Sequence, residues 1–327
     1  MRNIAVLSHI ADIDGVGAAA LVKMKYRIPA SNMFFTSYGR KETEDAEKEM
    51  TPLLRRRITL FITDLAVEPL ALPAYTRIIN KVKAHGGKVI VLDHHPWSEE
   101  MTRKIVKRCD FAVFGENRQM CATELVRKYL ELDGRFVREF TYLVHHTDFF
   151  IMLKEKRYKK LAEQYKMSIG GIGMSKSYRT KLKNLRHIAD LISKGKFTDA
   201  KVAGIAARFD RLNRQRIEKM LKGVYRISDR LAVGFARQTD STDACYRIIK
   251  KEHVDISVVV NLDHSSGSIR SARSNVVKLA NAMGGGGHPH ASGFGIDAKS
   301  YNSFRTKADR EKFVRKLENS ARRLNLL

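Results

Sequence analysis

Short, uninterrupted apolar runs alternate with longer helix-forming segments through the first 150 residues of the chain. The run at 89–92 is rich in β-branched residues and follows the turn at Gly86 and Gly87, which is typical of a parallel strand covered on both faces. Equivalent runs predict further strands at 4–7, 32–37, 58–63 and 111–114. Helices are predicted between and after them at 16–26, 41–50, 69–84, 123–132 and 135–144. This alternation predicts a doubly wound parallel α/β domain.

The pattern changes in the middle of the chain and then returns to α/β. Long polar helices are expected at 177–193 and 198–221, and Gly170, Gly171 and Gly173 are expected to interrupt the segment before them. Strands at 231–235, 256–262 and 268–273 and helices at 242–252, 276–283 and 303–324 indicate a smaller second α/β domain. We therefore expect a catalytic domain at 1–165, a basic helical linker at 166–225 and a second domain at 226–327.

The charge of the chain points to a polyanionic partner. The sequence has 61 Lys and Arg against 35 Asp and Glu, a formal net charge of +26 and a pI near 10.1. Residues 154–230 alone contain 22 Lys and Arg against 7 Asp and Glu. A solvated helical face is the structural alternative for this segment, and an acidic protein partner would use the same charges.

Other features of the sequence indicate a cytoplasmic protein that is not bound to a membrane. No apolar stretch approaches the roughly 18 residues of a transmembrane helix, and the N-terminus runs directly into a strand without the pattern of a signal peptide. The cysteines Cys109, Cys121 and Cys245 are odd in number and widely spaced, so neither a disulfide framework nor a zinc site is indicated.

Acids and imidazoles recur where the predicted strands and helices of the first domain end. Taken singly, each of these residues could be a helix cap or a surface side chain. Because parallel strands open onto a crevice at their carboxyl ends, we expect the residues to converge there. A bare site with so many carboxylates would be too anionic, so two divalent cations about 3.5–4 Å apart are expected, of which Mn²⁺ suits mixed oxygen and nitrogen ligands and Mg²⁺ is an alternative. The residues are His9, Asp12, Asp14, Asp64, Asp93, His94, His95 and Asp148.

A run of four glycines and a histidine, residues 284–288, follows the short predicted helix of the second domain. Such a run could be a flexible linker, but it lies between predicted elements rather than between domains. Glycines at a helix end let the backbone approach a phosphate, and Arg270, Arg273 and His288 could hold its charge.

These motifs resemble those of the DHH-family phosphoesterases with a DHH-associated C-terminal domain, a group of RecJ-type nucleases, oligoribonucleases and cyclic-dinucleotide phosphodiesterases. The resemblance covers nearly the whole chain. The first motif corresponds to His9, Asp12 and Asp14, the second to Asp64, the third to Asp93, His94 and His95, the fourth to Asp148, and the glycine-rich signature of the associated domain to residues 284–288.

The resemblance also implies a role for each residue. One metal would be held by His9, Asp12 and Asp64, and the other by Asp14, Asp64, His94 and Asp148. Asp93 would orient the neighbouring imidazoles, and His95 would face the scissile phosphate. The substrate would be gripped from the second domain by Arg270, Arg273, Gly285, Gly286, Gly287 and His288.

The function expected from these features is a metal-dependent exonuclease that hydrolyses single-stranded RNA or DNA, or short oligonucleotides. A small-nucleotide phosphodiesterase or phosphatase, acting on a cyclic dinucleotide or a 3′-phosphoadenosine-type substrate, is the alternative enzyme, although it has no need of a +26 surface. A binding protein that kept the fold and lost catalysis is the third alternative, and the presence of all the acidic ligands argues against it.

Overall fold

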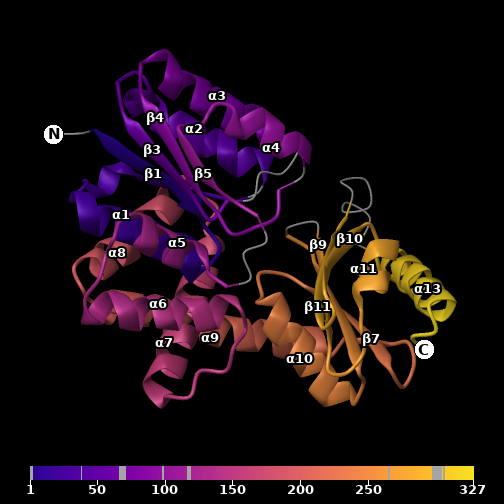
Figure 1. The fold of residues 1–327 in the computed structure, drawn as a ribbon. Helices are drawn as coiled ribbons and strands as arrows, with labels where there is room; N and C mark the ends of the chain where they lie inside the picture. Colours follow the sequence, from indigo (N-terminus) through magenta and orange to yellow (C-terminus); the bar gives the residue numbers. More distant parts are fainter. Residues whose placement is uncertain are drawn as a thin grey trace. The chain divides into compact units, whose positions relative to one another are not determined.

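The computed structural model describes residues 3–37, 39–65, 71–97, 99–115, 119–263, 266–296, 304 and 306–327 (Figure 1). The chain forms two compact units, residues 1–209 and residues 210–327. The segment predicted as a linker, 166–225, contains the end of α7 (Lys156–Gly173) and the whole of α8 (Tyr178–Ser193) and α9 (Ala200–Leu221).

The first unit is built on a parallel sheet with the strand order β2-β1-β3-β4-β5. Helices lie on both faces of this sheet, with α1, α5, α6 and α8 on one side and α2, α3 and α4 on the other (Figure 1). The doubly wound α/β fold predicted from the apolar runs is thus confirmed. The strands are β1 (Ile4–His9), β2 (Met33–Thr36), β3 (Thr59–Thr63), β4 (Lys88–Leu92) and β5 (Phe111–Val113).

The helices of this unit include two that the pattern did not predict, α4 and α7. Residues 69 and 70, at the start of one predicted helix, lie outside the described residues. The helices are α1 (Ile13–Tyr26), the 3₁₀ turn η1 (Ala30–Asn32), α2 (Arg40–Leu54), α3 (Leu72–Ala84), α4 (Glu99–Val106), α5 (Ala122–Tyr129), α6 (Arg135–Asp148), α7 (Lys156–Gly173), α8 (Tyr178–Ser193) and the first part of α9 (Ala200–Leu221), whose remaining residues belong to the second unit.

The prediction that glycines interrupt the chain near residue 170 is wrong. Gly170 and Gly171 lie inside α7, where a β-carbon on either would come within 3.0 Å or 2.9 Å of the Phe209 side chain. The absence of side chains therefore lets Phe209 of α9 pack against α7, and this contact stabilises a helix that glycine would otherwise weaken.

Helix α8 protects the edge of the sheet at β2. The Tyr178 hydroxyl donates to the carbonyl of Phe35 at 2.7 Å, and the Arg186 guanidinium donates to the carbonyls of Met33 and Ser31, each at 2.7 Å. These bonds satisfy carbonyl groups that an exposed edge strand would offer to another chain.

The second unit has a mixed sheet with the order β10-β11-β9-β8-β7-β6, in which only β7 and β8 pair in parallel among the described strands. Apolar side chains of α13 pack on one face, and α10 packs on β7 and β8 from the other. Residue 303, the predicted start of the last helix, lies outside the described residues. The elements are β6 (Tyr225–Arg226), β7 (Leu231–Ala236), α10 (Ser241–Glu252), β8 (Ile256–Asn261), β9 (Ser266–Ser271), α11 (Val277–Ala282), β10 (Gly285–His288), β11 (Ala291–Gly295) and α13 (Lys307–Arg323).

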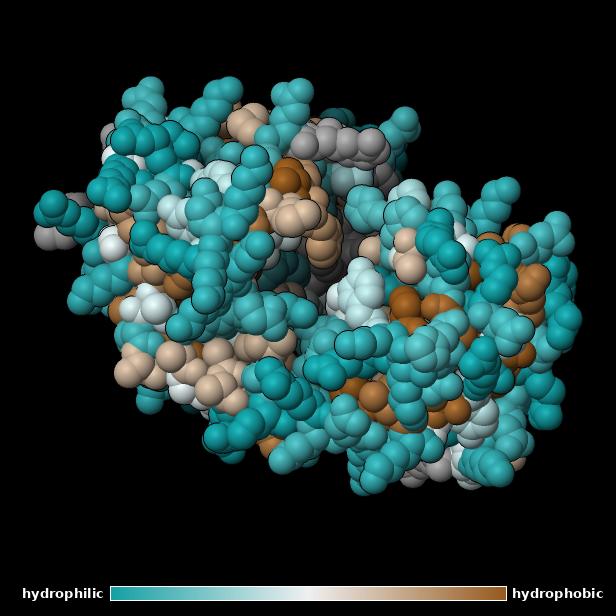
Figure 2. Space-filling model, turned by 90° about the horizontal axis from the view of Figure 1, so that it is seen from below, coloured by the Kyte–Doolittle hydropathy of each residue, from teal (hydrophilic) through white to brown (hydrophobic). Residues whose placement is uncertain are grey.

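Hydrophilic side chains cover most of the molecular face seen in Figure 2, as expected for a chain with a net charge of +26. Among the helices that the structure describes, none is both long enough and apolar enough to span a membrane.

Candidate active site

The predicted metal ligands of the first unit converge at the carboxyl ends of three neighbouring strands. His9 is the last residue of β1, Asp64 follows β3, and His94 lies two residues beyond the end of β4. Because β1, β3 and β4 are adjacent and parallel, their ends bring these side chains to one edge of the sheet. Asp148, the last residue of α6, reaches the same place from a helix.

The first group that could hold a metal ion consists of His9, Asp12 and Asp64. His9 Nδ1 lies 2.8 Å from Asp12 Oδ2 and 3.6 Å from Asp64 Oδ2. Asp12 also caps α1, since its side chain accepts a hydrogen bond from the Gly15 amide at 3.1 Å. The helix start and the ligand group therefore fix each other.

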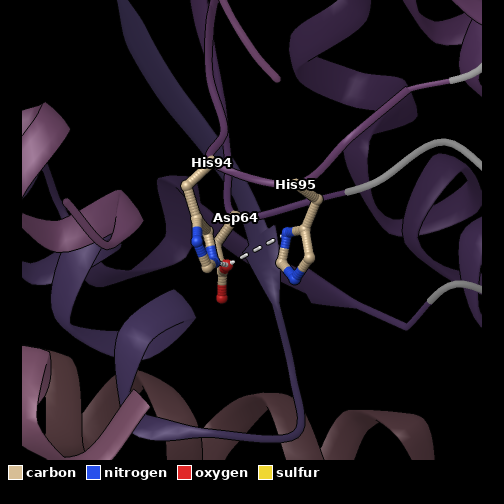
Figure 3. A group of neighbouring side chains, drawn as sticks. All are labelled: Asp64, His94 and His95. Carbon is tan, nitrogen blue, oxygen red and sulfur yellow. Dashed lines mark ion pairs between the residues drawn. The ribbon is translucent and has the colours of Figure 1, made fainter. Parts of the chain in front are cut away.

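Two more groups of possible metal ligands lie at the same edge of the sheet. Asp14, His94 and Asp148 form one of them, with His94 Nε2 3.8 Å from Asp14 Oδ2 and 3.7 Å from Asp148 Oδ2. Asp64, His94 and His95 form the other, with Asp64 Oδ1 3.5 Å from His94 Nε2 and 3.8 Å from His95 Nδ1 (Figure 3). Asp64 and His94 thus connect all three groups into a single cluster, which we call the Asp/His cluster.

The donor atoms of this cluster fit a divalent cation. Asp64 Oδ2 and His94 Nε2 are buried and have no hydrogen-bond partner among the residues that the structure describes. Burying such atoms unpaired is costly, so they are best explained as lone pairs that face a common ligand. Carboxylate oxygens and imidazole nitrogens at these spacings are the ligands of Mn²⁺, Mg²⁺ or Zn²⁺.

The electrostatics of the cluster agree with that fit. Burial and the charges of Asp14 and Asp12 raise the pKa of Asp64 well above its usual range. Burial and Asp14 likewise raise the pKa of Asp148 to about 8, although His94 opposes them. These carboxyl groups keep protons that they would lose in water, and a bound cation would take the place of those protons.

The backbone has a special arrangement at two of these acids. Both oxygens of the buried Asp14 accept backbone N–H groups at the start of α5, from Ala122 and Thr123, each at 2.7 Å. Asp64 has a φ of 56°, in the left-handed region that non-glycine residues rarely adopt. Such strain is characteristic of functional positions that the surrounding structure enforces.

Asp93 does not join any of the three metal groups but orients His95. Its Oδ1 lies 2.8 Å from His95 Nδ1, and its Oδ2 accepts the indole N–H of Trp97 at 2.6 Å. Burial disfavours the charged form of His95, but the hydrogen bond and charge of Asp93 outweigh burial and raise the pKa of this imidazole. Trp97 was missed by the sequence analysis, although it follows the motif directly and is the one tryptophan of the chain.

Two histidines of α6, His145 and His146, lie near the cluster without joining its metal groups. His145 Nδ1 lies 2.7 Å from Glu124 Oε2, and His146 Nδ1 lies 2.9 Å from the carbonyl of Tyr142. Their ring nitrogens are used in fixing α6 against α5 and within its own last turn.

In the second unit, the two predicted arginines differ in how they are held. The Arg270 guanidinium donates to the carbonyls of Ile269 and Ser292 and to the Thr242 hydroxyl, so its position is fixed. The Arg273 side chain is 86% exposed, with its Nε 4.0 Å from Asp255. Arg270 is therefore an ordered donor, whereas Arg273 can move toward an anion.

The glycine-rich run forms a strand, which the sequence analysis did not predict. Residues 285–288 are β10 and pair with β11 in the register Gly285↔Phe294, Gly286↔Gly293 and His288↔Ala291. Ala291 in turn pairs with Arg270 of β9, and directly paired residues share a face of the sheet. His288, Ala291 and Arg270 therefore lie on one face, and the paired Gly286 and Gly293 lie on the same face.

The glycines of β10 have different reasons to be glycine. A β-carbon on Gly285 would lie 2.0 Å from the Gly293 carbonyl oxygen, and one on Gly287, whose φ is +135°, would lie 2.8 Å from that of Ala291. A β-carbon on Gly286 would have only Asn281 Oδ1 near it, at 3.6 Å. Packing thus accounts for Gly285 and Gly287, and Gly286 leaves backbone open to a ligand.

Comparison with known proteins adds a domain match and two similar folds. Residues 201–317 match the DHHA1 domain, and no curated protein matches the chain in a sequence search. The chain is similar to an exopolyphosphatase-related protein from Bacteroides fragilis, with a TM-score of 0.54 and 14% identity over 99% of this chain and 94% of that one. It is also similar to the pGpG-specific phosphodiesterase PggH from Vibrio cholerae, with a TM-score of 0.51 and 14% identity over 95% of this chain and 98% of that one. At these identities the likeness shows the fold.

The first unit thus combines a doubly wound fold with an Asp/His cluster at its strand ends, and residues 201–317, which include most of the second unit, match the DHHA1 domain. The resemblance found in the sequence, to a DHH-family phosphoesterase with a DHH-associated C-terminal domain, is confirmed by the domain match and the shared fold.

Proposed function

We propose that this protein is a metal-dependent phosphodiesterase that acts as an exonuclease on single-stranded nucleic acid or short oligonucleotides. The observation that carries the proposal is the joining of the three metal groups through Asp64 and His94. A carboxylate shared between two groups is the arrangement required for a pair of cations that act on one phosphoryl group.

In this proposal one Mn²⁺ or Mg²⁺ would be held by His9, Asp12 and Asp64, and a second by Asp14, Asp64, His94 and Asp148. When bound, such ions polarise a phosphoryl oxygen and lower the pKa of the attacking water.

The remaining chemistry falls to side chains of the chain itself. His95 is fixed by Asp93 through Nδ1, so its Nε2 would be the atom that donates to the phosphate or its leaving oxygen. The raised pKa of His95 favours the charged imidazole, which suits it to this donation. Arg270, Arg273, His288 and the open backbone at Gly286 would hold another phosphate or a terminal nucleotide.

The charge of the chain supports a polyanionic substrate. A net charge of +26 costs self-repulsion, and a protein that handled only a mononucleotide would have no use for it. A small-nucleotide phosphodiesterase is the second candidate, because PggH, which has a similar fold, is described as a pGpG-specific phosphodiesterase.

A hydrolysis panel tests the proposal. It compares 5′- and 3′-labelled RNA and DNA oligomers, a linear and a cyclic dinucleotide and a 3′-phosphoadenosine nucleotide, each in Mn²⁺, in Mg²⁺ and in EDTA. We expect turnover of oligomers from one end in Mn²⁺, no turnover in EDTA, and recovery when Mn²⁺ is restored. Full activity after verified metal removal would contradict the metal requirement, and turnover confined to the dinucleotides or the phosphoadenosine would favour the second candidate.

A further inference from the structure

Three consecutive large apolar side chains are exposed directly after α6. Phe150 is 80% exposed, Ile151 46% and Met152 78%, whereas the next residue, Leu153, is buried at 7%. Single exposed apolar residues are ordinary, but a contiguous group indicates a surface with a partner. The segment is held at both ends. Helix α6 precedes it, and Leu153, which follows it, belongs to the hydrophobic core.

Phe150 occupies a backbone position at which glycine is the usual residue. Ile151 N–H donates to the carbonyl of His146 at 2.8 Å and Phe150 N–H to that of Thr147 at 3.4 Å, which is the Schellman arrangement for ending a helix. The φ of Phe150 is 55°, where a side chain is unfavourable. Burial does not offset this cost, because the ring is mostly exposed. The ring is therefore kept at the expense of folding stability.

Phe150 is also close in the chain to a residue of the Asp/His cluster. Phe150 is two residues from Asp148, so their α-carbons are at most about 7 Å apart. Phe149, between them, packs its ring edge-to-face against the His94 imidazole with the centroids 5.9 Å apart. Lys154 and Lys156 follow the segment as exposed cations. An aromatic face beside a phosphate site, with lysines next to it, is the combination that binds single-stranded nucleic acid.

We propose that Phe150 is a stacking platform for the base of the nucleotide whose phosphate reaches the Asp/His cluster. This inference rests on the proposed function and deepens it, because it makes a nucleotide rather than a base-free phosphate chain the preferred substrate. A single base needs only one exposed ring, whereas a protein partner would need a much larger apolar area than this segment offers.

The experiment compares two substrates and three variants in Mn²⁺. One substrate is a trinucleotide, and the other is the same molecule with an abasic terminal residue. Phe150→Gly removes the ring and relieves the backbone, Phe150→Tyr keeps a ring, and Tyr246→Ala removes an exposed aromatic residue of the second unit as a control. We expect Phe150→Gly to lower kcat/KM on the trinucleotide about 5- to 150-fold, the range for loss of one stacked base, and to leave the abasic substrate unchanged. Phe150→Tyr and Tyr246→Ala should match the wild type on both substrates.

Several outcomes would contradict the proposed stacking role of Phe150. An equal loss on both substrates would show that Phe150 supports the cluster, and no loss on either would show that the ring has no part in binding. Concentration-dependent dimerisation of the wild type that Phe150→Gly abolishes, without the substrate difference, would assign the surface to a second copy of the chain. Turnover by the wild type tests the proposed function separately. If the wild type hydrolyses neither substrate, metal-free binding of the two fluorescently labelled trinucleotides to wild type and Phe150→Gly still decides the platform.

Discussion

Trp97 donates its indole N–H to Asp93 Oδ2 at 2.6 Å, on the side of the carboxylate that does not hold His95. Because a carboxylate accepts hydrogen bonds, the partner atom His95 Nδ1 carries a proton. Asp93 is thus fixed from both oxygens, and the orientation of His95 depends on a tryptophan that does not itself touch the metal groups.

We expect Trp97→Phe to lower kcat about 10-fold while the fold and metal binding are retained, since a lost partner of an orienting carboxylate typically costs this much. The substituted ring can still stack on Phe114, whose centroid is 5.2 Å from that of Trp97. Phe114→Leu is the matched control, because it removes the stacking and keeps the N–H. Steady-state kinetics with circular dichroism provide the measurement, and a larger loss in Phe114→Leu would show that stacking, not the hydrogen bond, is what matters.

Replacing Asp64 should lower turnover but raise the stability of the metal-free protein. Asp64→Asn is expected to lower kcat by at least about 100-fold, because a residue shared between metal groups should cost more than an outer partner does. In EDTA at pH 7 the same variant should unfold at a higher urea concentration than the wild type. The reason is that burial and nearby carboxylates raise the pKa of Asp64 in the folded protein.

Because the pKa of Asp64 is raised in the folded protein, the stability gained by Asp64→Asn should depend on pH. Between the unfolded pKa of about 3.9 and the raised folded pKa, the folded state binds more protons than the unfolded state, so stability falls as the pH rises. Asp64→Asn removes that slope, and its advantage should therefore grow from pH 4 toward neutral pH. Asp110→Asn, which alters an acid paired with Lys83 at 2.8 Å outside the cluster, is the control for turnover. A metal-free Asp64→Asn protein less stable than the wild type at pH 7 would contradict the argument.

The fold of the first unit could be predicted from the sequence because each of its strands is marked by a local pattern of apolar residues. Each buried strand is a continuous apolar run, and parallel strands bring their ends together by topology, so residues as distant as His9 and His94 could be placed at one edge without a structure. What the residues do within the cluster was given by the resemblance and stays a prediction.

The features that sequence analysis missed depend on contacts between distant residues. Glycine usually interrupts helices, yet Gly170 and Gly171 lie in α7 because Phe209 packs on them. The exposure of Phe150 and the bond from Trp97 to Asp93 likewise leave no periodic signal. Glycine in β10 is a similar case, since its strand exists through pairing with β11.

Gly285→Ala and Gly286→Ala should fail in different ways. The β-carbon at Gly285 would clash with backbone at 2.0 Å, so this variant should lose stability, with a lower urea midpoint and reduced yield of folded protein. The β-carbon at Gly286 meets nothing closer than 3.6 Å, so this variant should fold like the wild type and instead raise KM several-fold if the backbone approaches the substrate. Urea unfolding and steady-state kinetics on the same oligomer separate the two. An unchanged KM in Gly286→Ala would remove this strand from the substrate site.

The basic charge of α9 can be tested by the dependence of binding on salt. Four arginines of this helix, Arg208, Arg211, Arg214 and Arg216, are candidates to line a track for a single strand. Two of them are engaged within the chain: Arg214 pairs with Asp210 at 2.9 Å, and Arg216 donates to the carbonyl of Gln238 at 2.8 Å. Arg208 and Arg211 are exposed, which makes them the better candidates.

Each phosphate contact to a single strand contributes roughly −0.7 to the log–log slope of affinity against salt. If both arginines contact phosphates, Arg208→Gln combined with Arg211→Gln should reduce the magnitude of the slope by about 1.4 and weaken a long oligomer more than a dinucleotide. The control is Arg55→Gln combined with Arg56→Gln, which removes the same charge from exposed positions after α2. Binding is measured without metal, so that catalysis does not consume the strand. A slope that changes equally in both double variants would mean that net charge alone attracts the strand, and equal affinities for long and short strands in the wild type would assign the basic surface to another partner.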